Sequence, residues 1–361
     1  MARIPITRPA IDDAEIDAVT AVLRSGMLVQ GEQVVEFERA IASSAGTEFA
    51  VALTNCTVAL EVALRGMGVG TNDSVVVTPY SWVATVNAIE IVGARPVFVD
   101  IDPDTFNLSS TGLRAALENH KIAAVLPVHT FGNLAGIETL IEISNAAKVP
   151  VLEDAACAIG AKSEGGSAGG MGVAGCFSFH PRKVVTTGEG GAITTNNAEL
   201  ADFARTYRNH GQSEGAFTAI GSNLRMTDFQ AAMGRAQMAK LEWIVSERSR
   251  LAEHYDKAMP TLGCVAQRRT IGSVVQSYVM LAPHGRTGAS IVEALRRRDI
   301  EATVGTIAIP FTRFHGQRYG LSPKDLPVVN DVNDRAVTLP LYPGLSSEQQ
   351  DTVLAALGEV L

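Results

Sequence analysis

The 361-residue sequence lacks the features that mark several classes of protein. Its four cysteines form no Cys-x-x-Cys pair and its histidines show no metal-ligand spacing, so we expect reduced thiols and no bound metal. No apolar run approaches the roughly 20 residues that span a bilayer, and the N-terminus has no apolar signal core. Acidic residues (38) outnumber lysine and arginine (30), so no overall positive charge favours nucleic acid. We therefore expect a cytoplasmic protein that binds neither nucleic acid nor a membrane.

Short strands and helices alternate regularly as far as residue 154. The strands are rich in valine, isoleucine and leucine, which is typical of strands that are buried on both faces. Such an alternation predicts βαβ units and a mostly parallel sheet between two layers of helices, so the fold class is α/β. The expected strands are 74–79, 95–101, 122–129 and 149–154, and the expected helices between them are 83–92, 111–119 and 136–147.

The C-terminal third has an α+β pattern instead. Thr227 or Asp228 is expected to cap one long helix that reaches residue 259 and bridges two domains. We therefore divide the chain into a large domain, residues 1–245, and a smaller C-terminal domain, residues 246–361. Two local expectations in the second domain are a strand at residues 274–282 and a capping box formed by Ser347 and Gln350.

A single lysine, Lys183, lies between two expected strands, residues 176–180 and 192–195, in a loop rich in threonine and glycine. A buried lysine loses its charge readily, which suits an amine that reacts with a buried electrophile. An exposed lysine on an ordinary loop would give the same pattern. The loop by itself leaves both interpretations open.

Gly170, Gly172 and Gly175 match the GxGxxG spacing of a dinucleotide-binding turn. That turn requires a strand before it and a helix after it. Here a loop precedes the glycines and the expected strand 176–180 follows them. We therefore reject a nucleotide site at these glycines, and the sequence has no GxxxxGK[ST] phosphate loop either.

Two other features lie at strand ends. Asp154 ends the expected strand 149–154, at the sheet edge where ligands bind in α/β folds. Cys56 and Thr57 begin a helix directly after another strand, and free N–H groups at such a position favour an anion. Plain N-capping by Asn55 or Thr57 is the alternative.

Pyridoxal phosphate would explain these features together. Its aldehyde needs a lysine (Lys183), its ring nitrogen needs a carboxylate (Asp154), and its phosphate needs a helix N-terminus (Cys56 and Thr57). Trp82, at another strand end, is either a ring that stacks on the cofactor or a half-buried core residue.

Several longer motifs resemble those of the DegT/DnrJ/EryC1/StrS family of sugar aminotransferases, which are fold-type-I enzymes that use pyridoxal phosphate. The resemblance covers nearly the whole chain and implies a large domain with a central sheet sandwiched by helices, plus the smaller C-terminal α+β domain. The motifs, in the family's order, are residues 79–85 (PYSWVAT), 93–100 (GARPVFVD), 153–156 (EDAA), 177–191 around Lys183, and 223–232 (NLRMTDFQAA).

The resemblance also implies roles for individual residues. Lys183 would bond to the cofactor and then carry the proton, and Asp154 would keep the ring nitrogen protonated. Arg225 would contact an acidic substrate. The other implied cofactor contacts are Cys56, Thr57 and Ser178 on the phosphate, Trp82 on the ring, Cys157 beside the 3-hydroxyl, and Asn223 from the partner subunit of a homodimer with shared sites.

Three histidines remain without a settled role. His129 resembles a family motif near the cofactor, and a structural role fits it equally well. His210 and His315 fall in loop-like regions, where contacts to a sugar nucleotide are plausible.

The sequence departs from the family pattern at three positions. Cys56 stands where the family usually has glycine or alanine, Cys157 where it usually has glutamine, and Val173 where it often has aspartate. A cysteine is a weaker hydrogen-bond partner than glutamine, so the tuning of the cofactor or the choice of substrate can differ.

The resemblance implies that an amino group moves in two half-reactions from L-glutamate to a keto group on a nucleotide-linked deoxysugar, with pyridoxamine phosphate as the intermediate form of the cofactor. A cyclitol or another keto-carbocycle is the alternative acceptor. A sugar 3-dehydratase of the same family would carry histidine in place of Lys183. A non-catalytic regulatory protein that kept the fold is the rival from another class.

Overall fold

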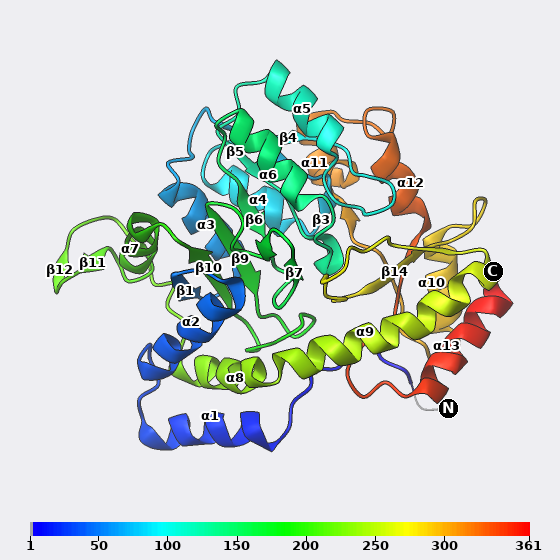
Figure 1. Cartoon of the computed structure of the whole chain (residues 1–361), viewed down its shortest axis with the longest axis horizontal. Helices are drawn as coiled ribbons and strands as arrows, with labels where there is room; N and C mark the ends of the chain where they lie inside the picture. Colours follow the sequence, from blue (N-terminus) through cyan, green and yellow to red (C-terminus); the bar gives the residue numbers. More distant parts are fainter. Residues whose placement is uncertain (1–2) are drawn as a thin grey trace.

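The computed structural model describes residues 3–361, and its main sheet is built between residues 49 and 195 (Figure 1). A four-stranded part, β1-β10-β9-β6, and a three-stranded part, β4-β2-β5, are joined by the parallel bridges Val125–Val151 and Val128–Asp154. Within this sheet β10 alone runs antiparallel to its neighbours, so the predicted mostly parallel sheet is confirmed. The strands are β1 (Phe49–Leu53), β2 (Ser74–Val77), β4 (Arg95–Phe98), β5 (Ala124–Leu126), β6 (Leu152–Asp154), β9 (Ala174–Ser178) and β10 (Gly191–Thr195).

Helices cover both faces of this sheet, because successive side chains of a strand point to opposite faces. On β2, Val75 and Val77 pack in the core beneath α3, α4 and α7, whereas Val76 packs beneath α5 and α6. None of the helices in residues 3–361 is long and apolar enough to cross a membrane. The helices of this part are α2 (Glu32–Ala45), α3 (Cys56–Gly66), α4 (Ala84–Ile91), α5 (Ser110–Asn119), α6 (Ile137–Ala146), α7 (Ala198–Tyr207) and α8 (Asp228–Ala239), with α1 (Asp13–Ser25) packed outside α8.

The C-terminal part has its own antiparallel sheet, in the order β13-β14-β17-β15. Helices α9, α10 and α13 share one apolar core with this sheet. The predicted α+β character of this part is confirmed. Its elements are α9 (Leu241–Ala258), β13 (Val265–Ala266), β14 (Tyr278–Leu281), α10 (Gly288–Arg296), β15 (Thr303–Val304), α11 (Arg313–Tyr319), α12 (Pro327–Arg335), β17 (Ala336–Leu339) and α13 (Ser347–Val360).

Short elements connect the two parts or project from them. Strand β3 pairs with β16 of the C-terminal part, and a hairpin of β11 and β12 projects at the left of Figure 1. These short elements are β3 (Tyr80–Ser81), β7 (Lys162–Ser163), β8 (Gly166–Ser167), β11 (Gln212–Ser213), β12 (Ala216–Phe217), β16 (Ile307–Ala308), and the 3-10 turns Thr130–Gly132, Met259–Leu262 and Ile309–Phe311.

Helix α9 passes from one core to the other. Leu241 and Ile244 at its start pack with the core of the main sheet, whereas Leu251 and Tyr255 pack with the C-terminal core. We propose that the domain boundary falls inside α9, between residues 245 and 246. The N-terminal arm crosses this boundary, because Ile4 packs in the C-terminal core.

The single long helix predicted from residue 227 or 228 to residue 259 is wrong. The chain breaks at Lys240 (φ −102°, ψ 2°) into α8 and α9, although Thr227 caps the first helix as predicted, in a capping box with Gln230. The Lys240 ammonium reaches the carboxylates of Asp12 and Glu15 at the start of α1. No glycine or proline marks the break, so the sequence pattern gives no signal for it.

Two smaller predictions in the C-terminal part are also corrected. The capping box of α13 is Ser346 with Gln349, whose side chains and N–H groups bond reciprocally, whereas Gln350 points inward and donates to the Leu251 carbonyl. The strand predicted at residues 274–282 begins only at Tyr278. The residues before it bond instead to the loop at residues 131–132.

Candidate active site

The carboxyl ends of several strands meet at one edge of the main sheet, where ligands bind in open α/β folds. Asp154 ends β6, Ser178 ends β9, and β10 starts beside them at Gly191. The chain also leaves β1 and enters α3 at Cys56 on this edge, since a β-carbon on Gly191 would overlap the Cys56 backbone. The fold therefore brings together the strand-end residues that the sequence singled out.

Lys183 lies on the loop between β9 and β10, and its side chain turns back towards this edge. Its Nζ donates a hydrogen bond to Cys157 Sγ at 3.1 Å. The loop backbone is fixed on both sides of the lysine, because the Lys183 N–H donates to the His180 carbonyl (2.8 Å) and the Gln276 side chain donates to the Arg182 carbonyl (2.6 Å). Lys183 is thus a partly buried and hydrogen-bonded lysine, not an exposed residue of an ordinary loop.

The charges of the neighbouring groups decide the state of this lysine. Burial by itself lowers the pKa of the Lys183 ammonium, but the adjacent Cys157 sulfur and the Asp154 carboxylate raise it, and the net direction is upward. Burial, followed by the charge of Asp154, raises the pKa of the Cys56 thiol well above its ordinary value. These directions favour the cationic form of Lys183 and the neutral thiol of Cys56.

Asp154 is only 3% exposed. One carboxylate oxygen accepts the Thr85 hydroxyl at 2.7 Å, and the other accepts the Ala156 N–H at 3.2 Å. Burial raises the pKa of the Asp154 carboxyl, although the Thr85 hydrogen bond and the charge of Lys183 act in the opposite direction. A cationic ring nitrogen placed against this carboxylate would offset the burial, so the site fits the predicted cofactor.

The start of α3 combines the two interpretations that the sequence left open. Asn55 is the N-cap, and its side chain accepts the Val58 N–H at 3.0 Å. The amides of Cys56 and Thr57, which precede Val58, donate no hydrogen bond to any residue in 3–361. Two N–H groups at the positive end of the helix dipole therefore stay available for an anion such as a phosphate.

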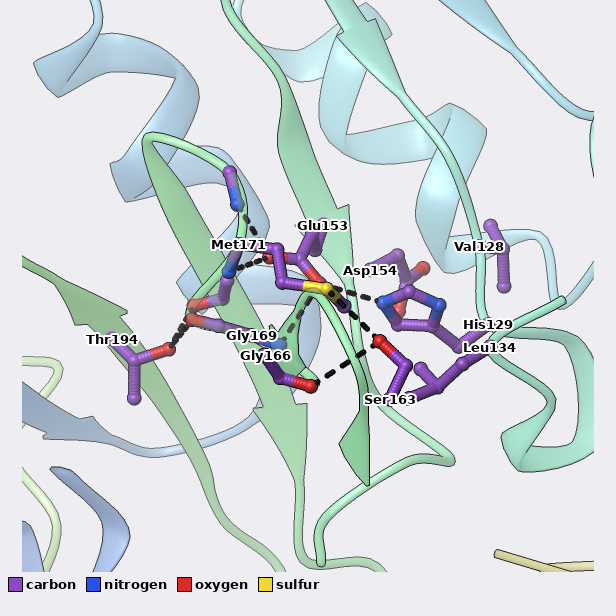
Figure 2. Close-up of polar contacts among 12 residues, drawn as sticks. Val128, His129, Leu134, Glu153, Asp154, Ser163, Gly166, Gly169, Met171 and Thr194 are labelled. Carbon is purple, nitrogen blue, oxygen red and sulfur yellow. Dashed lines mark hydrogen bonds and ion pairs between the residues drawn. The ribbon is translucent and has the colours of Figure 1, made fainter. Parts of the chain in front are cut away.

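Directly before Asp154, the buried carboxylate of Glu153 collects four hydrogen bonds (Figure 2). It accepts from His129 Nε2 at 2.8 Å and from the N–H groups of Gly169, Met171 and Gly172 at 2.7–2.9 Å. Glu153 and Asp154 point to opposite faces of β6, as alternation along a strand requires. Glu153 therefore anchors the glycine-rich loop beneath the site, and His129 is its buried partner.

The glycines of this loop have packing roles, and the rejection of a nucleotide turn stands. A β-carbon on Gly172 would overlap the Val151 carbonyl oxygen, and one on Gly175 would overlap Gly169. The strand β9 follows the loop, as the sequence predicted. The loop wraps around Glu153 and holds β6 and β9 together (Figure 2).

Three further predicted residues flank the site. Trp82 follows β3 and is 63% exposed, which leaves its ring free to stack on a ligand. Arg225 bridges to Leu53 at the end of β1, and its guanidinium donates to the Asn209 side chain at 2.6 Å. Asn223 is exposed two residues earlier and pairs with Asn209 through the backbone.

The two remaining histidines differ in their surroundings. His210 is exposed at the base of the β11–β12 hairpin, with a positive φ of 60°. His315 does not lie in a loop: it is buried on α11, where its Nδ1 bonds to the Thr312 hydroxyl at 2.9 Å. Neither contacts Asp154 or Lys183, and within residues 3–361 no three metal-ligating side chains gather into a group that could hold an ion.

Two residues of the site were not predicted from the sequence. Thr85 bonds directly to Asp154, and Glu153 organises the loop below it. Both stand inside motifs that the sequence comparison marked, at residues 79–85 and 153–156. The motif spacing was the available signal, but it did not tell which members reach the site.

Comparisons with known proteins agree with this geometry. The sequence profile of the DegT/DnrJ/EryC1/StrS aminotransferase family matches residues 9–358. GDP-perosamine synthase of Caulobacter vibrioides is 33% identical, with 99% of this chain and 98% of the relative covered. UDP-4-amino-4-deoxy-L-arabinose–oxoglutarate aminotransferase of Shewanella sediminis is 30% identical, with 99% and 98% covered.

A solved structure agrees over the same length. A putative sugar aminotransferase from Streptococcus pneumoniae, in its PMP-form, superimposes with a TM-score of 0.93 at 26% identity, over 99% of this chain and 97% of that chain. The same protein has been solved in its PLP-form. Since the family profile spans nearly the whole chain and the relatives are similar over their full length, the chain belongs to the DegT/DnrJ/EryC1/StrS aminotransferase family of pyridoxal-phosphate-dependent enzymes, and it is an aminotransferase.

Proposed function

We propose that this protein binds pyridoxal phosphate at the edge formed by β6, β9 and α3 and uses it to aminate a keto sugar. The observation that carries the proposal is that a partly buried Lys183 and a buried Asp154, whose charges influence each other, lie at one sheet edge with the free amides of α3. Asp154 would hold the ring nitrogen, and Trp82 would stack on the ring. The α3 amides, with the Thr57 and Ser178 side chains, would hold the phosphate.

When bound, the cofactor supplies an electron sink, because its pyridine ring accepts electrons once the ring nitrogen is protonated. The protein's own contribution follows from its charges. Asp154 keeps a positive charge on that nitrogen, because the ionised carboxylate is buried and needs a cationic partner. Lys183, when its amine is free, would take the proton from the substrate carbon that bears the amino group, and Cys157 Sγ holds that amine through the 3.1 Å hydrogen bond from Nζ.

For the two substrates we propose L-glutamate as donor and a nucleotide-linked keto sugar as acceptor. The names of the relatives support this choice, because one makes GDP-perosamine and the other pairs a UDP-linked aminosugar with oxoglutarate, the keto form of glutamate. Arg225 supplies a partly buried cation near the end of β1 for the donor's carboxylate.

The exposed apolar side chains support a homodimer in which the active sites are shared. They lie on α1, on α2, on the loop between these helices, on β12 and just after it, and exposed apolar patches mark sites of protein–protein interaction. In sedimentation velocity we expect a single species of twice the chain mass; a concentration-independent monomer would contradict the proposal. The residues are Ile16, Leu23, Met27, Val29, Val35, Phe217 and Ile220.

The function is tested by spectroscopy and product detection together. We expect the purified protein to carry a visible absorption band after incubation with pyridoxal phosphate, and L-glutamate to bleach it. A keto-sugar nucleotide should restore the band and appear as an aminosugar nucleotide in mass spectrometry. A protein that binds no cofactor would overturn the proposal. If only keto-carbocycles restore the bleached band, the acceptor is a keto-carbocycle and not a keto-sugar nucleotide.

A further inference from the structure

A chain of buried hydroxyl groups leads to Asp154 from outside the strands that carry the site. Thr85, in the first turn of α4, donates to the Asp154 carboxylate at 2.7 Å, and Ser81 on β3 lies 2.9 Å from the Thr85 hydroxyl oxygen. Thr85 is 1% exposed and Ser81 is 6% exposed. Water is therefore largely excluded from both hydrogen bonds, which makes each of them stronger.

The direction of both bonds follows from the chemistry of the groups. An ionised carboxylate only accepts hydrogen bonds, and a hydroxyl has one hydrogen to donate. Since the Thr85 hydrogen is used on Asp154, the Thr85 oxygen must accept from Ser81. Both dipoles then point their positive ends towards the ionised Asp154 carboxylate and stabilise its negative charge.

The supporting shell fixes Ser81 in place. Ser81 pairs with Ile307 in β16 of the C-terminal part, and the neighbouring Tyr80 pairs with Ala308. The Tyr80 hydroxyl accepts the Thr306 N–H at 3.2 Å, so the β3–β16 pairing is held by a side chain as well as by the backbone. The hydroxyl chain thus starts on a rigid contact between the two domains.

We propose that Thr85 is a positioning residue: its hydroxyl holds the Asp154 carboxylate in the orientation and acceptor state that the cofactor's ring nitrogen requires, with Ser81 as the next donor. The proposal rests on the proposed function for its cofactor. The α4 helix has no side-chain cap at its start, and Thr85 does not supply one. Its hydroxyl is instead committed to Asp154, 69 residues away in the sequence.

Other titratable groups also face Asp154, and their charges influence its pKa in wild type and variant alike. They are Lys183 from the β9–β10 loop, His129 after β5, Cys56 at the start of α3 and Cys176 on β9. A substitution of Thr85 leaves all four in place. A change in the titration of Asp154 in such a variant is therefore assigned to the lost hydroxyl.

The experiment is a double-mutant cycle on cofactor affinity. Thr85→Val keeps the shape and removes the hydroxyl, Thr85→Ser keeps the hydroxyl, and Asp154→Asn removes the charge. We expect Thr85→Val to raise the dissociation constant for pyridoxal phosphate at pH 7 by roughly ten- to a hundredfold, as for a hydrogen bond to a charged group. Thr85→Ser should stay near wild type. In the Asp154→Asn background, Thr85→Val should change the dissociation constant less than about twofold.

The pH dependence gives a second readout that a purely structural role would not move. The Thr85 hydrogen bond lowers the pKa of Asp154, so its loss raises that pKa and protonates the carboxyl at a higher pH. The acid limb of cofactor binding should therefore shift to higher pH in Thr85→Val. The control is Thr195→Val. Thr195 lies on β10, and its buried hydroxyl donates to the Val173 carbonyl.

Two results would overturn the proposal. One is an acid limb of cofactor binding that does not shift in Thr85→Val. The other is a loss of affinity on Thr85→Val that is equally large in the wild-type and the Asp154→Asn backgrounds. A wild-type protein that binds no cofactor at any pH would refute the proposed function instead. In that case, carbon-13 NMR titration of the Asp154 carboxyl in cofactor-free wild type and Thr85→Val tests the role of the Thr85 hydroxyl without the cofactor. An unchanged Asp154 titration in Thr85→Val would reject the hydrogen bond's role.

Discussion

Replacing Lys183 by alanine should remove the visible absorption band of the lysine-bonded cofactor and slow amino transfer by at least about a thousandfold. The variant loses the amine that bonds to the cofactor and the base that moves the proton, and no second lysine takes part in the contacts around Asp154 and Cys157 within residues 3–361. Stopped-flow absorbance with L-glutamate measures the first half-reaction, and product detection measures the whole.

Lys162→Ala is the matched control, because Lys162 is an exposed lysine on β7. It should keep the band and the rate of wild type. Small primary amines added to Lys183→Ala should restore part of the rate, since they supply the missing base. A Lys183→Ala protein that transfers amino groups within tenfold of wild type would remove Lys183 from its proposed role.

Replacing Glu153 by glutamine should lower the free energy of unfolding by about 3 kcal/mol, although Glu153 touches no ligand site. Its carboxylate is fully buried and accepts four hydrogen bonds, three of them from backbone N–H groups (Figure 2). A glutamine amide would direct its own N–H groups at one or more of those donors. Urea denaturation at pH 7 measures the loss, with the exposed Glu164→Gln as a control that should change little.

The same variant has a predicted pH dependence. Burial alone would raise the pKa of Glu153, but the hydrogen bond and charge of His129 and the N–H groups of Gly172 and Gly169 lower it, and the net direction is downward. A carboxyl with a lowered pKa stabilises the folded state fully above its unfolded value of about 4.3, and the stabilisation disappears as the pH falls through the folded value. The difference between wild type and Glu153→Gln should thus be constant from pH 6 to 8 and shrink below about pH 4; a difference that grows at low pH would contradict it.

Local sequence patterns predicted much of the fold and the two residues that we propose as the reactive centre. The alternation of valine-rich strands with amphipathic helices predicted the parallel sheet, because the period of apolar residues reflects which faces are buried. Asp154 was found from its place at a strand end, since that edge collects ligands in α/β folds. Lys183 was marked by the glycine-rich loop between two strands, and the family motifs then joined these positions.

Other features depended on contacts between distant segments. The break at Lys240 coincides with ion pairs to Asp12 and Glu15, more than two hundred residues earlier, and the residues before β14 bond to the loop at 131–132. The sequence left a structural and a functional role open for His129, and only the structure shows that this histidine is buried and bonded to Glu153.

The sequence by itself thus determined the fold class and the order of the main elements, and it led to the proposal of Lys183 and Asp154 as the central pair of the site, because these inferences depend on local periodicity and strand ends. The tertiary structure alone decided which side chains support that pair. Thr85 meets Asp154, and Cys157 meets Lys183, across segments whose separation along the chain carries no signal of their contact. Hydrogen bonds of this kind depend on side-chain position to within fractions of an ångström, and only the packed domain fixes that position.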